Sequence, residues 1–155
     1  MPSNVSVAFI IISAMMVMAC ATPEYATGRP AITLVGLTLS KEVLQKGNIA
    51  VPQGTGRTFR TTDKEVAALI SFKNLYGIIN LRWDWYNPDG YLFHTKRTET
   101  IQTSEGKYFK EFSAWHVLTV AGDRVAKMPG EWTVKVYMND DLLASKSFAI
   151  LEEDE

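Results

Sequence analysis

The stretch that decides the fold is Ile79-Asn80-Leu81-Arg82-Trp83-Asp84-Trp85-Tyr86, which is followed by the turn sequence Asn87-Pro88-Asp89-Gly90. The odd-numbered residues of this stretch are large and apolar, whereas the even-numbered residues are polar or carry a hydroxyl group. Successive side chains of a β-strand point to opposite faces, so the alternation predicts a strand with one apolar face and one wet face. Two inward-facing tryptophans need a second layer to bury them. The stretch therefore predicts a β-sandwich.

The turn sequence predicts that this strand is the first half of a hairpin. Pro88 presets φ for the second position of a β-turn, and Gly90 can take the left-handed conformation that ends it. Residues 91–97 then return as a second strand, and the threonine-rich residues 98–104 are expected to continue it.

The remaining chain alternates between short apolar runs and turn residues. Strands are expected over residues 31–40, 64–72, 114–120, 131–138 and 142–151, and a loop over residues 51–57. Two segments stay open: residues 41–47 fit a helical turn or a short strand, and residues 108–115 permit a helical turn before the strand. Clean alternation assigns Trp83, Trp85 and Trp132 to the core. About seven or eight short strands with turns between them are typical of an all-β sandwich.

Two segments resemble those of bacterial envelope domains with an immunoglobulin-like sandwich. Residues 81–90 are similar to the tryptophan strand and Pro-Asp-Gly turn of those domains, and residues 129–148 are similar to their closing hairpin. The resemblance implies an immunoglobulin-like β-sandwich of antiparallel strands. It implies no activity, because a sandwich hosts many functions.

The N-terminus predicts an export signal. Residues 5–21 carry no charge, and residues 7–19 are almost wholly apolar, which is short of the roughly 20 residues of a comfortable membrane span but suits a signal peptide. The run ends in Val17-Met18-Ala19-Cys20, which resembles the lipobox of bacterial lipoproteins. An uncleaved membrane anchor, or a signal cut after Ala21, are the alternatives.

The lipobox resemblance, the strand pattern and the acidic C-terminal residues together divide the chain into four expected parts. These are a signal peptide (1–19), a lipidated cysteine with its tether (20–30), the β-sandwich domain (31–151) and an acidic tail (152–155). The resemblance implies a diacylglycerol with palmitate-type chains on Cys20, and more than one chain gives stable anchoring in a membrane. Ala21 is not the aspartate that tends to retain lipoproteins at the inner membrane, so the outer membrane is the expected location. With one cysteine, the chain has no internal disulfide.

Composition and motifs argue against catalysis. A net charge of −1 offers no basic surface for nucleic acid. His94 and His116 are the only histidines, too few for a zinc site, and they could meet only if their strands were neighbours. The pair Asp84 and Asp89 fits sugar hydrolysis, but Asp89 is explained by the turn and Asp84 by pairing with Arg82 or a neighbouring strand. No catalytic residue, metal ligand or cofactor is predicted.

Surface tyrosines are the candidates for binding. Tyr86, Tyr91 and Tyr137 lie on or near predicted wet faces, where flat rings can contact a protein or stack on a sugar. The sequence therefore predicts a membrane-anchored, non-enzymatic envelope lipoprotein that binds or assembles with another envelope protein. The alternatives are a domain that binds a carbohydrate or another small ligand, and a structural subunit of a surface fibre or envelope complex.

Overall fold

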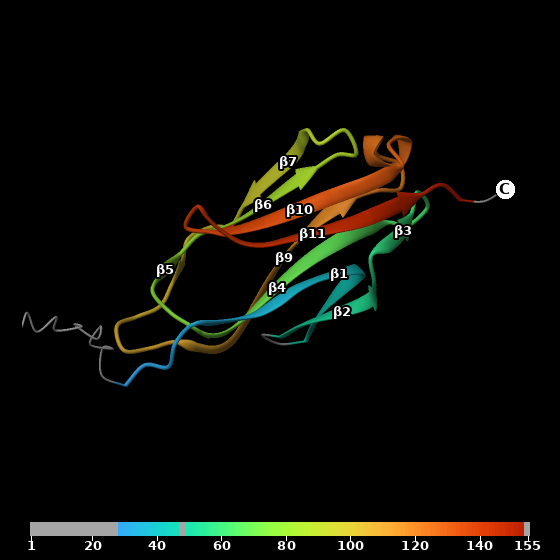
Figure 1. The fold of residues 1–155 in the computed structure, drawn as a ribbon. Helices are drawn as coiled ribbons and strands as arrows, with labels where there is room; N and C mark the ends of the chain where they lie inside the picture. Colours follow the sequence, from blue (N-terminus) through green and yellow to red (C-terminus); the bar gives the residue numbers. More distant parts are fainter. Residues whose placement is uncertain (1–27, 47–48, 154–155) are drawn as a thin grey trace, which may run out of the picture.

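The computed structural model describes residues 28–46 and 49–153, and in this part of the chain it is almost entirely β-structure (Figure 1). Eight of the eleven strands are longer than three residues, in line with the predicted number. The strands are β1 (Thr33–Lys46), β2 (Ile49–Thr55), β3 (Thr58–Arg60), β4 (Glu65–Leu75), β5 (Ile78–Ile79), β6 (Leu81–Tyr86), β7 (Leu92–Arg97), β8 (Ile101–Gln102), β9 (Phe109–Thr119), β10 (Gly130–Met138) and β11 (Asp141–Leu151). One 3₁₀-helix, η1 (Arg124–Lys127), precedes β10. Within these residues, no helix has the length and apolar character that a membrane span requires.

Two sheets form the layers of a sandwich (Figure 1). One sheet has the strand order β2-β1-β4-β9, and the other has the order β3-β11-β10-β6-β7. In the first sheet, β1, β4 and β9 correspond to strands A, B and E of an immunoglobulin-like sandwich. In the second sheet, β6, β7, β10 and β11 correspond to strands C, C′, F and G. All pairs are antiparallel except β3 with β11, which is parallel. The strand order therefore confirms the predicted fold class.

The core lies between the two sheets and is built on β6. Leu81, Trp83 and Trp85 are at most 1% exposed, which confirms the alternation predicted for this strand. The indole Nε1 of Trp83 donates to the backbone oxygen of Ala68 in β4 (3.1 Å), and that of Trp85 donates to Nδ1 of His116 in β9 (3.0 Å). Both hydrogen bonds cross from one sheet to the other, so β6 links the two layers through polar as well as apolar contacts.

The predicted turns also form. The backbone N–H of Gly90 donates to the oxygen of Asn87 (2.9 Å), and Gly90 has a φ of +82°. Between β10 and β11, Asn139 and Asp140 have φ values of +51° and +72°. Two consecutive residues with positive φ give the tight two-residue turn whose twist matches a β-hairpin.

Two local expectations are wrong, and two segments that the sequence left open are decided. The loop expected over residues 51–57 is largely strand, because β2 pairs with β1 from Ile49 to Thr55. Residues 41–46 take the strand alternative and form the second half of β1. The strand expected to continue over residues 98–104 is interrupted: β7 ends at Arg97, where the Thr98 hydroxyl bonds to the N–H and oxygen of Leu81, and residues 101–102 form β8, which pairs with β5 in a separate sheet. The helical turn considered before residue 116 is absent, since β9 pairs with β4 along its length.

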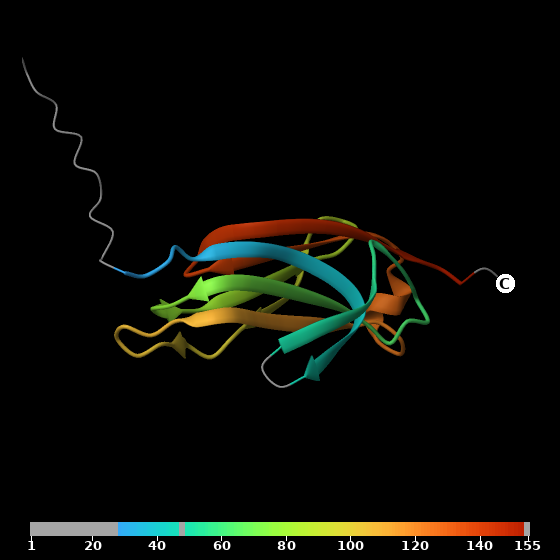
Figure 2. The same cartoon turned by 90° about the horizontal axis from the view of Figure 1, so that it is seen from below.

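The second half of β1 turns away from the sandwich and, with β2, folds back below it (Figure 2). Ala50 of β2 is 8% exposed and lines a cavity of about 210 Å³ together with Ser71 and Ser113. These two serines lie on the outer face of β4 and β9 and hydrogen-bond to each other (2.9 Å). This hairpin therefore covers part of the outer face of the four-stranded sheet.

The predicted signal peptide, Cys20 and most of the predicted tether lie outside the described residues. The described chain begins at Gly28 at one end of the sandwich and leaves from β11 at the opposite end (Figures 1 and 2).

Candidate functional site

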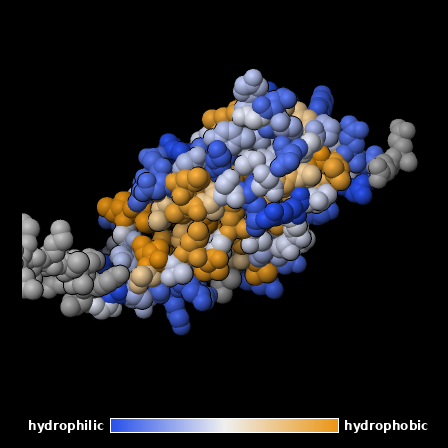
Figure 3. Space-filling model, in the orientation of Figure 1, coloured by the Kyte–Doolittle hydropathy of each residue, from blue (hydrophilic) through white to orange (hydrophobic). Residues whose placement is uncertain are grey.

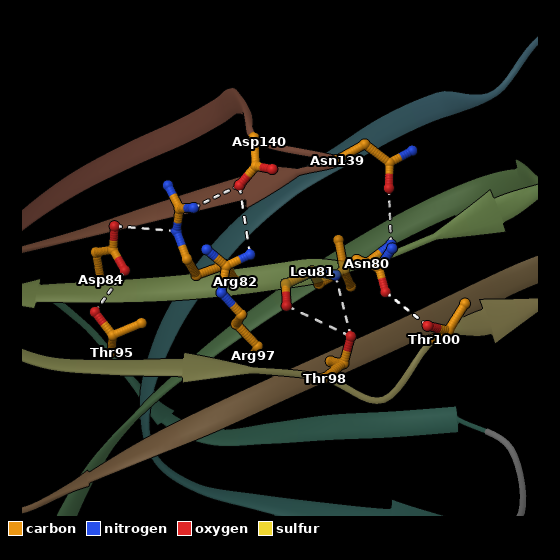
Figure 4. Close-up of polar contacts among 10 residues, drawn as sticks. All are labelled: Asn80, Leu81, Arg82, Asp84, Thr95, Arg97, Thr98, Thr100, Asn139 and Asp140. Atoms are coloured by element: carbon orange, nitrogen blue, oxygen red, sulfur yellow. Dashed lines mark hydrogen bonds and ion pairs between the residues drawn. The ribbon is translucent and has the colours of Figure 1, made fainter.

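Asp84 lies on the predicted wet face of β6 but is only 7% exposed. Its Oδ2 accepts from Nε of Arg82 (3.2 Å), and its Oδ1 accepts from the hydroxyl of Thr95 (2.9 Å) (Figure 4). Thr95 comes from β7, whose register places it opposite Asp84. The expectation that this face is simply wet is therefore wrong at Asp84, because neighbouring side chains cover the carboxylate. The pairing with Arg82 explains Asp84 without a catalytic role, while Asp89 is exposed in the turn.

Arg82 joins this carboxylate to the β10–β11 turn. Its Nη1 lies 2.6 Å from Oδ1 of Asp140, and Nη1 of Arg97 lies 3.4 Å from the same oxygen. The hollow beside them, about 360 Å³, is lined by Ile78, Asn80, Arg82, Arg97, Asn139 and Asp140. Figure 4 shows Arg82 and Arg97 converging on Asp140, while Asn139 reaches the backbone N–H of Asn80. Two guanidinium groups and two carboxylates balance in charge, so the network is suited to holding β6, β7 and the turn together.

We expect the Asp84→Ala variant to lose about 1–3 kcal/mol of free energy of unfolding, because a nearly buried, charge-assisted pair of hydrogen bonds disappears. Asp89→Ala, in the exposed turn, is the matched control and should stay within about 0.5 kcal/mol of the parent protein. Urea denaturation followed by circular dichroism measures both. Equal midpoints for the two variants would show that the Arg82 network contributes nothing to stability.

Two of the three predicted tyrosines meet on the outer face of this sheet. The phenol of Tyr137 lies close enough to Tyr86 to affect its ionisation: burial, followed by Tyr137, raises the pKa of Tyr86. The Nζ of Lys135 lies 4.7 Å from the centre of the Tyr86 ring, and the guanidinium of Arg82 lies 4.1 Å from the centre of the Tyr137 ring. Each ring therefore has one face covered by a cation, which leaves less flat surface for a sugar.

Tyr91 stands apart from these two rings. It is 71% exposed, and its backbone N–H donates to Oδ1 of Asn87 (2.8 Å) in the β6–β7 turn. Among the described residues, its ring stacks on neither of the other tyrosines. The structure thus brings together Tyr86 and Tyr137 but not Tyr91. The sequence did not predict that Arg82 and Lys135 cover the tyrosine rings, because the pairing register of β6 with β10 cannot be read from sequence alone.

The two histidines are stacked although their strands belong to different sheets. The ring centres of His94 (β7) and His116 (β9) are 5.2 Å apart with an angle of 20° between the planes. β7 and β9 are the edge strands of the two sheets on the same side of the sandwich. The two histidines therefore meet across the gap between the sheets, although their strands are not paired within one sheet. Burial, followed by the charges of His94 and Lys96, lowers the pKa of His116 to about 4.

This histidine pair lacks a third metal ligand. Asp123 lines the same hollow of about 340 Å³, but its carboxylate accepts from the N–H of Arg124 and caps η1. Within residues 28–46 and 49–153, no group of three or more histidine, cysteine or acidic side chains could hold a metal ion.

A further surface lies at the end of the sandwich where the described chain begins, and we call it the tether end. It consists of residues 28–35, 73–79, 101–111 and 138–142, which are the entering chain, the β4–β5 corner, the segment from β8 to the start of β9, and the β10–β11 turn with the residues beside it. Six of the ten large apolar side chains that are exposed in the described chain belong to it: Leu34, Val35, Ile78, Tyr108, Phe109 and Leu142. Figure 3 shows apolar side chains gathered over this half of the visible face. The four others lie on the β1–β2 hairpin or toward the opposite end: Leu44, Tyr91, Leu92 and Leu151.

Comparison with known proteins gives similarity in solved structures only. No protein-family model matches the chain, and no curated protein matches it. An immunoglobulin-like protein from Pseudomonas aeruginosa is 15% identical, with a TM-score of 0.43 over 79% of this chain and 98% of that chain. The C-terminal domain of Wzt is 11% identical, with a TM-score of 0.44 over 83% of this chain and 77% of that chain.

A third similar structure is the alkylpurine DNA glycosylase AlkC of Pseudomonas fluorescens bound to DNA. It is 11% identical, with a TM-score of 0.43, and the match covers 77% of this chain but 30% of the glycosylase. At these identities and scores the similarities carry no statement about activity. The assignment of an immunoglobulin-like sandwich rests on the strand order of the two sheets.

Proposed function

We propose that this protein is a lipid-anchored, non-enzymatic lipoprotein of the bacterial cell envelope, located in the outer membrane, which binds another envelope protein. The observation that carries the proposal is the placement of the only cysteine of the chain, Cys20, directly after Ala19 at the end of an apolar run. Acylation at Cys20 confines the sandwich to a membrane surface and raises its effective concentration there.

The open edge of β11 supports a role in binding or assembly. β11 pairs with β10 along its length, but β3 covers its other edge only from Ala149 to Leu151. In the described part of the chain, no strand pairs with that edge over residues 142–148. Unpaired backbone groups of a sheet edge can accept an extended segment of another protein as an added strand. This edge also favours the second candidate function, a structural subunit of an envelope complex.

The third candidate, carbohydrate binding, has less support. Such a site needs exposed flat rings that lie side by side, whereas the rings of Tyr86 and Tyr137 are covered on one face by Lys135 and Arg82. Tyr91 is exposed but has no second ring beside it among the described residues.

The test is affinity capture of the tagged full-length protein from bacterial membranes, with Cys20→Ser as the variant and Ser13→Ala as the matched control inside the apolar run. We expect the parent protein and the control to fractionate with the outer membrane, to carry acyl chains by mass spectrometry, and to retain the same partner after capture. Cys20→Ser should lose the acyl mass and no longer fractionate with the outer membrane, because its side chain cannot form the thioether.

Two results contradict the proposal separately. A parent protein without acyl mass overturns the anchor at Cys20. An acylated parent protein that captures no envelope protein overturns the binding role while leaving the anchor in place.

A further inference from the structure

We propose that the tether end of the sandwich rests on the lipid bilayer, with its exposed apolar side chains in contact with lipid. This inference rests on the proposed anchor at Cys20 and deepens it, because it states how the anchored domain is oriented and which surface the membrane occupies.

The first argument is reach. Gly28, where the described chain begins, is the eighth residue after Cys20. An extended residue spans at most about 3.6 Å, so Gly28 lies within about 30 Å of the acylated sulfur. The tether therefore brings one end of the sandwich to the bilayer, while β11 leaves the domain at the other end (Figure 1).

The second argument is that the tether end is held together as one surface. The guanidinium of Arg29 lies 5.5 Å from the centre of the Tyr76 ring, which ties the entering chain to the β4–β5 corner. The N–H of Gly77 donates to the hydroxyl of Thr103 (2.8 Å). The side-chain amide of Asn139 donates to the oxygen of Ile78 (3.1 Å). These contacts connect the entry, the corner, the segment after β8 and the β10–β11 turn.

The third argument is the chemistry of that surface. Ile78 is 61% exposed and Leu142 is 55% exposed, although each lies in a strand next to the folded core. Side chains of this kind gain by leaving water for the acyl region of a bilayer. Tyr108, also exposed, has the apolar ring and polar tip that suit the boundary between lipid and water.

The charges at and beside the tether end are nearly balanced. The basic side chains are Arg29, Lys73, Arg82, Arg97, Lys107 and Lys110, and the acidic ones are Asp84, Glu105, Glu111, Asp140 and Asp141. An electrostatic contact requires an excess of basic residues and weakens with salt. The contact proposed here is apolar, so it should form on neutral lipid and persist at high salt.

The test uses the acylated, full-length protein purified from membranes and placed in protein-free vesicles of phosphatidylcholine. Cys20 is the only cysteine, and acylation consumes its thiol, so an added cysteine takes up a nitroxide label alone. Ile78→Cys and Leu142→Cys place the label on the tether end. Leu92→Cys is the matched control at the opposite end, because Leu92 and Leu142 are both 55% exposed. Electron paramagnetic resonance compares collisions of each label with oxygen, which concentrates in lipid, and with a nickel chelate, which stays in water.

We expect the labels at positions 78 and 142 to show a several-fold higher ratio of oxygen to nickel collisions than the label at position 92. The ratio should be the same in neutral and anionic vesicles and at high salt. Equal ratios at all three positions overturn the proposal. They would favour a protein partner, in place of lipid, as the occupant of the tether end. Failure of the anchor is a different result: mass spectrometry of the parent protein would then show no acyl chains, whether Cys20 is retained with a free thiol or removed with the signal.

Discussion

We expect the Trp83→Ala variant to lose about 3–5 kcal/mol of free energy of unfolding. Trp83 is 1% exposed and fills the space between the two sheets, so its removal leaves a large cavity that the sandwich cannot close. The variant also loses the hydrogen bond from the indole Nε1 to the oxygen of Ala68, which links β6 to β4 across the core. A loss of this size is a large fraction of the stability of an ordinary domain.

Two further variants separate the contributions of Trp83. Trp83→Phe keeps most of the apolar volume and loses the hydrogen bond, so its stability should lie between those of the parent protein and Trp83→Ala. Leu92→Ala, at an exposed site, should change stability by no more than about 0.5 kcal/mol. Urea denaturation measured by circular dichroism ranks the three. If Trp83→Ala and Leu92→Ala have the same midpoint, the sandwich does not depend on this tryptophan.

We expect the second large effect on acidification from pH 7 to pH 4. The pKa of His116 is lowered to about 4 in the folded protein by burial and by His94 and Lys96, whereas an unfolded histidine titrates near 6.5. Between these values the unfolded chain binds more protons than the folded chain, so stability falls as the pH falls from about 6.5 to about 4. Protonation at Nδ1 also removes the acceptor for the indole of Trp85. Since the ring is half-buried and partly screened by water, the loss is on the order of 1–2 kcal/mol.

The matched variant for this effect is His116→Gln, which does not titrate in this range. Urea midpoints at pH 7, 6, 5 and 4 should fall less steeply for His116→Gln than for the parent protein. Parallel curves for the two proteins would contradict an effect of His116. Asp63 does not account for the same window. Burial alone would raise the pKa of Asp63, but its bonds to Lys41 and to the N–H of Arg60 lower it overall, so its contribution to stability is lost only at lower pH.

The anchoring and location of the protein remain predictions, because the segment that carries them lies outside the described residues. The apolar run and Cys20 are local signals that export enzymes read from an extended chain, which is why sequence alone suffices to propose them. The binding residues are different. Tyr86 and Tyr137 were named for their predicted exposure, whereas the cations that cover their rings come from a register that no local pattern encodes.

Local sequence patterns predicted the central hairpin, the tight turns and the core tryptophans, but not the β1–β2 hairpin. Alternation along β6 and β10 and the glycine at position 90 are local features, and local sterics and burial are enough to specify them. The pairing of Asp84 with Arg82 was among the predictions, but the contact with Thr95 depends on the register of β6 with β7, and the stacking of His94 on His116 depends on how the two sheets pack. The fold also places six exposed apolar side chains at one end of the sandwich. These contacts depend on strand order and register, which arise from pairing between residues far apart in the chain.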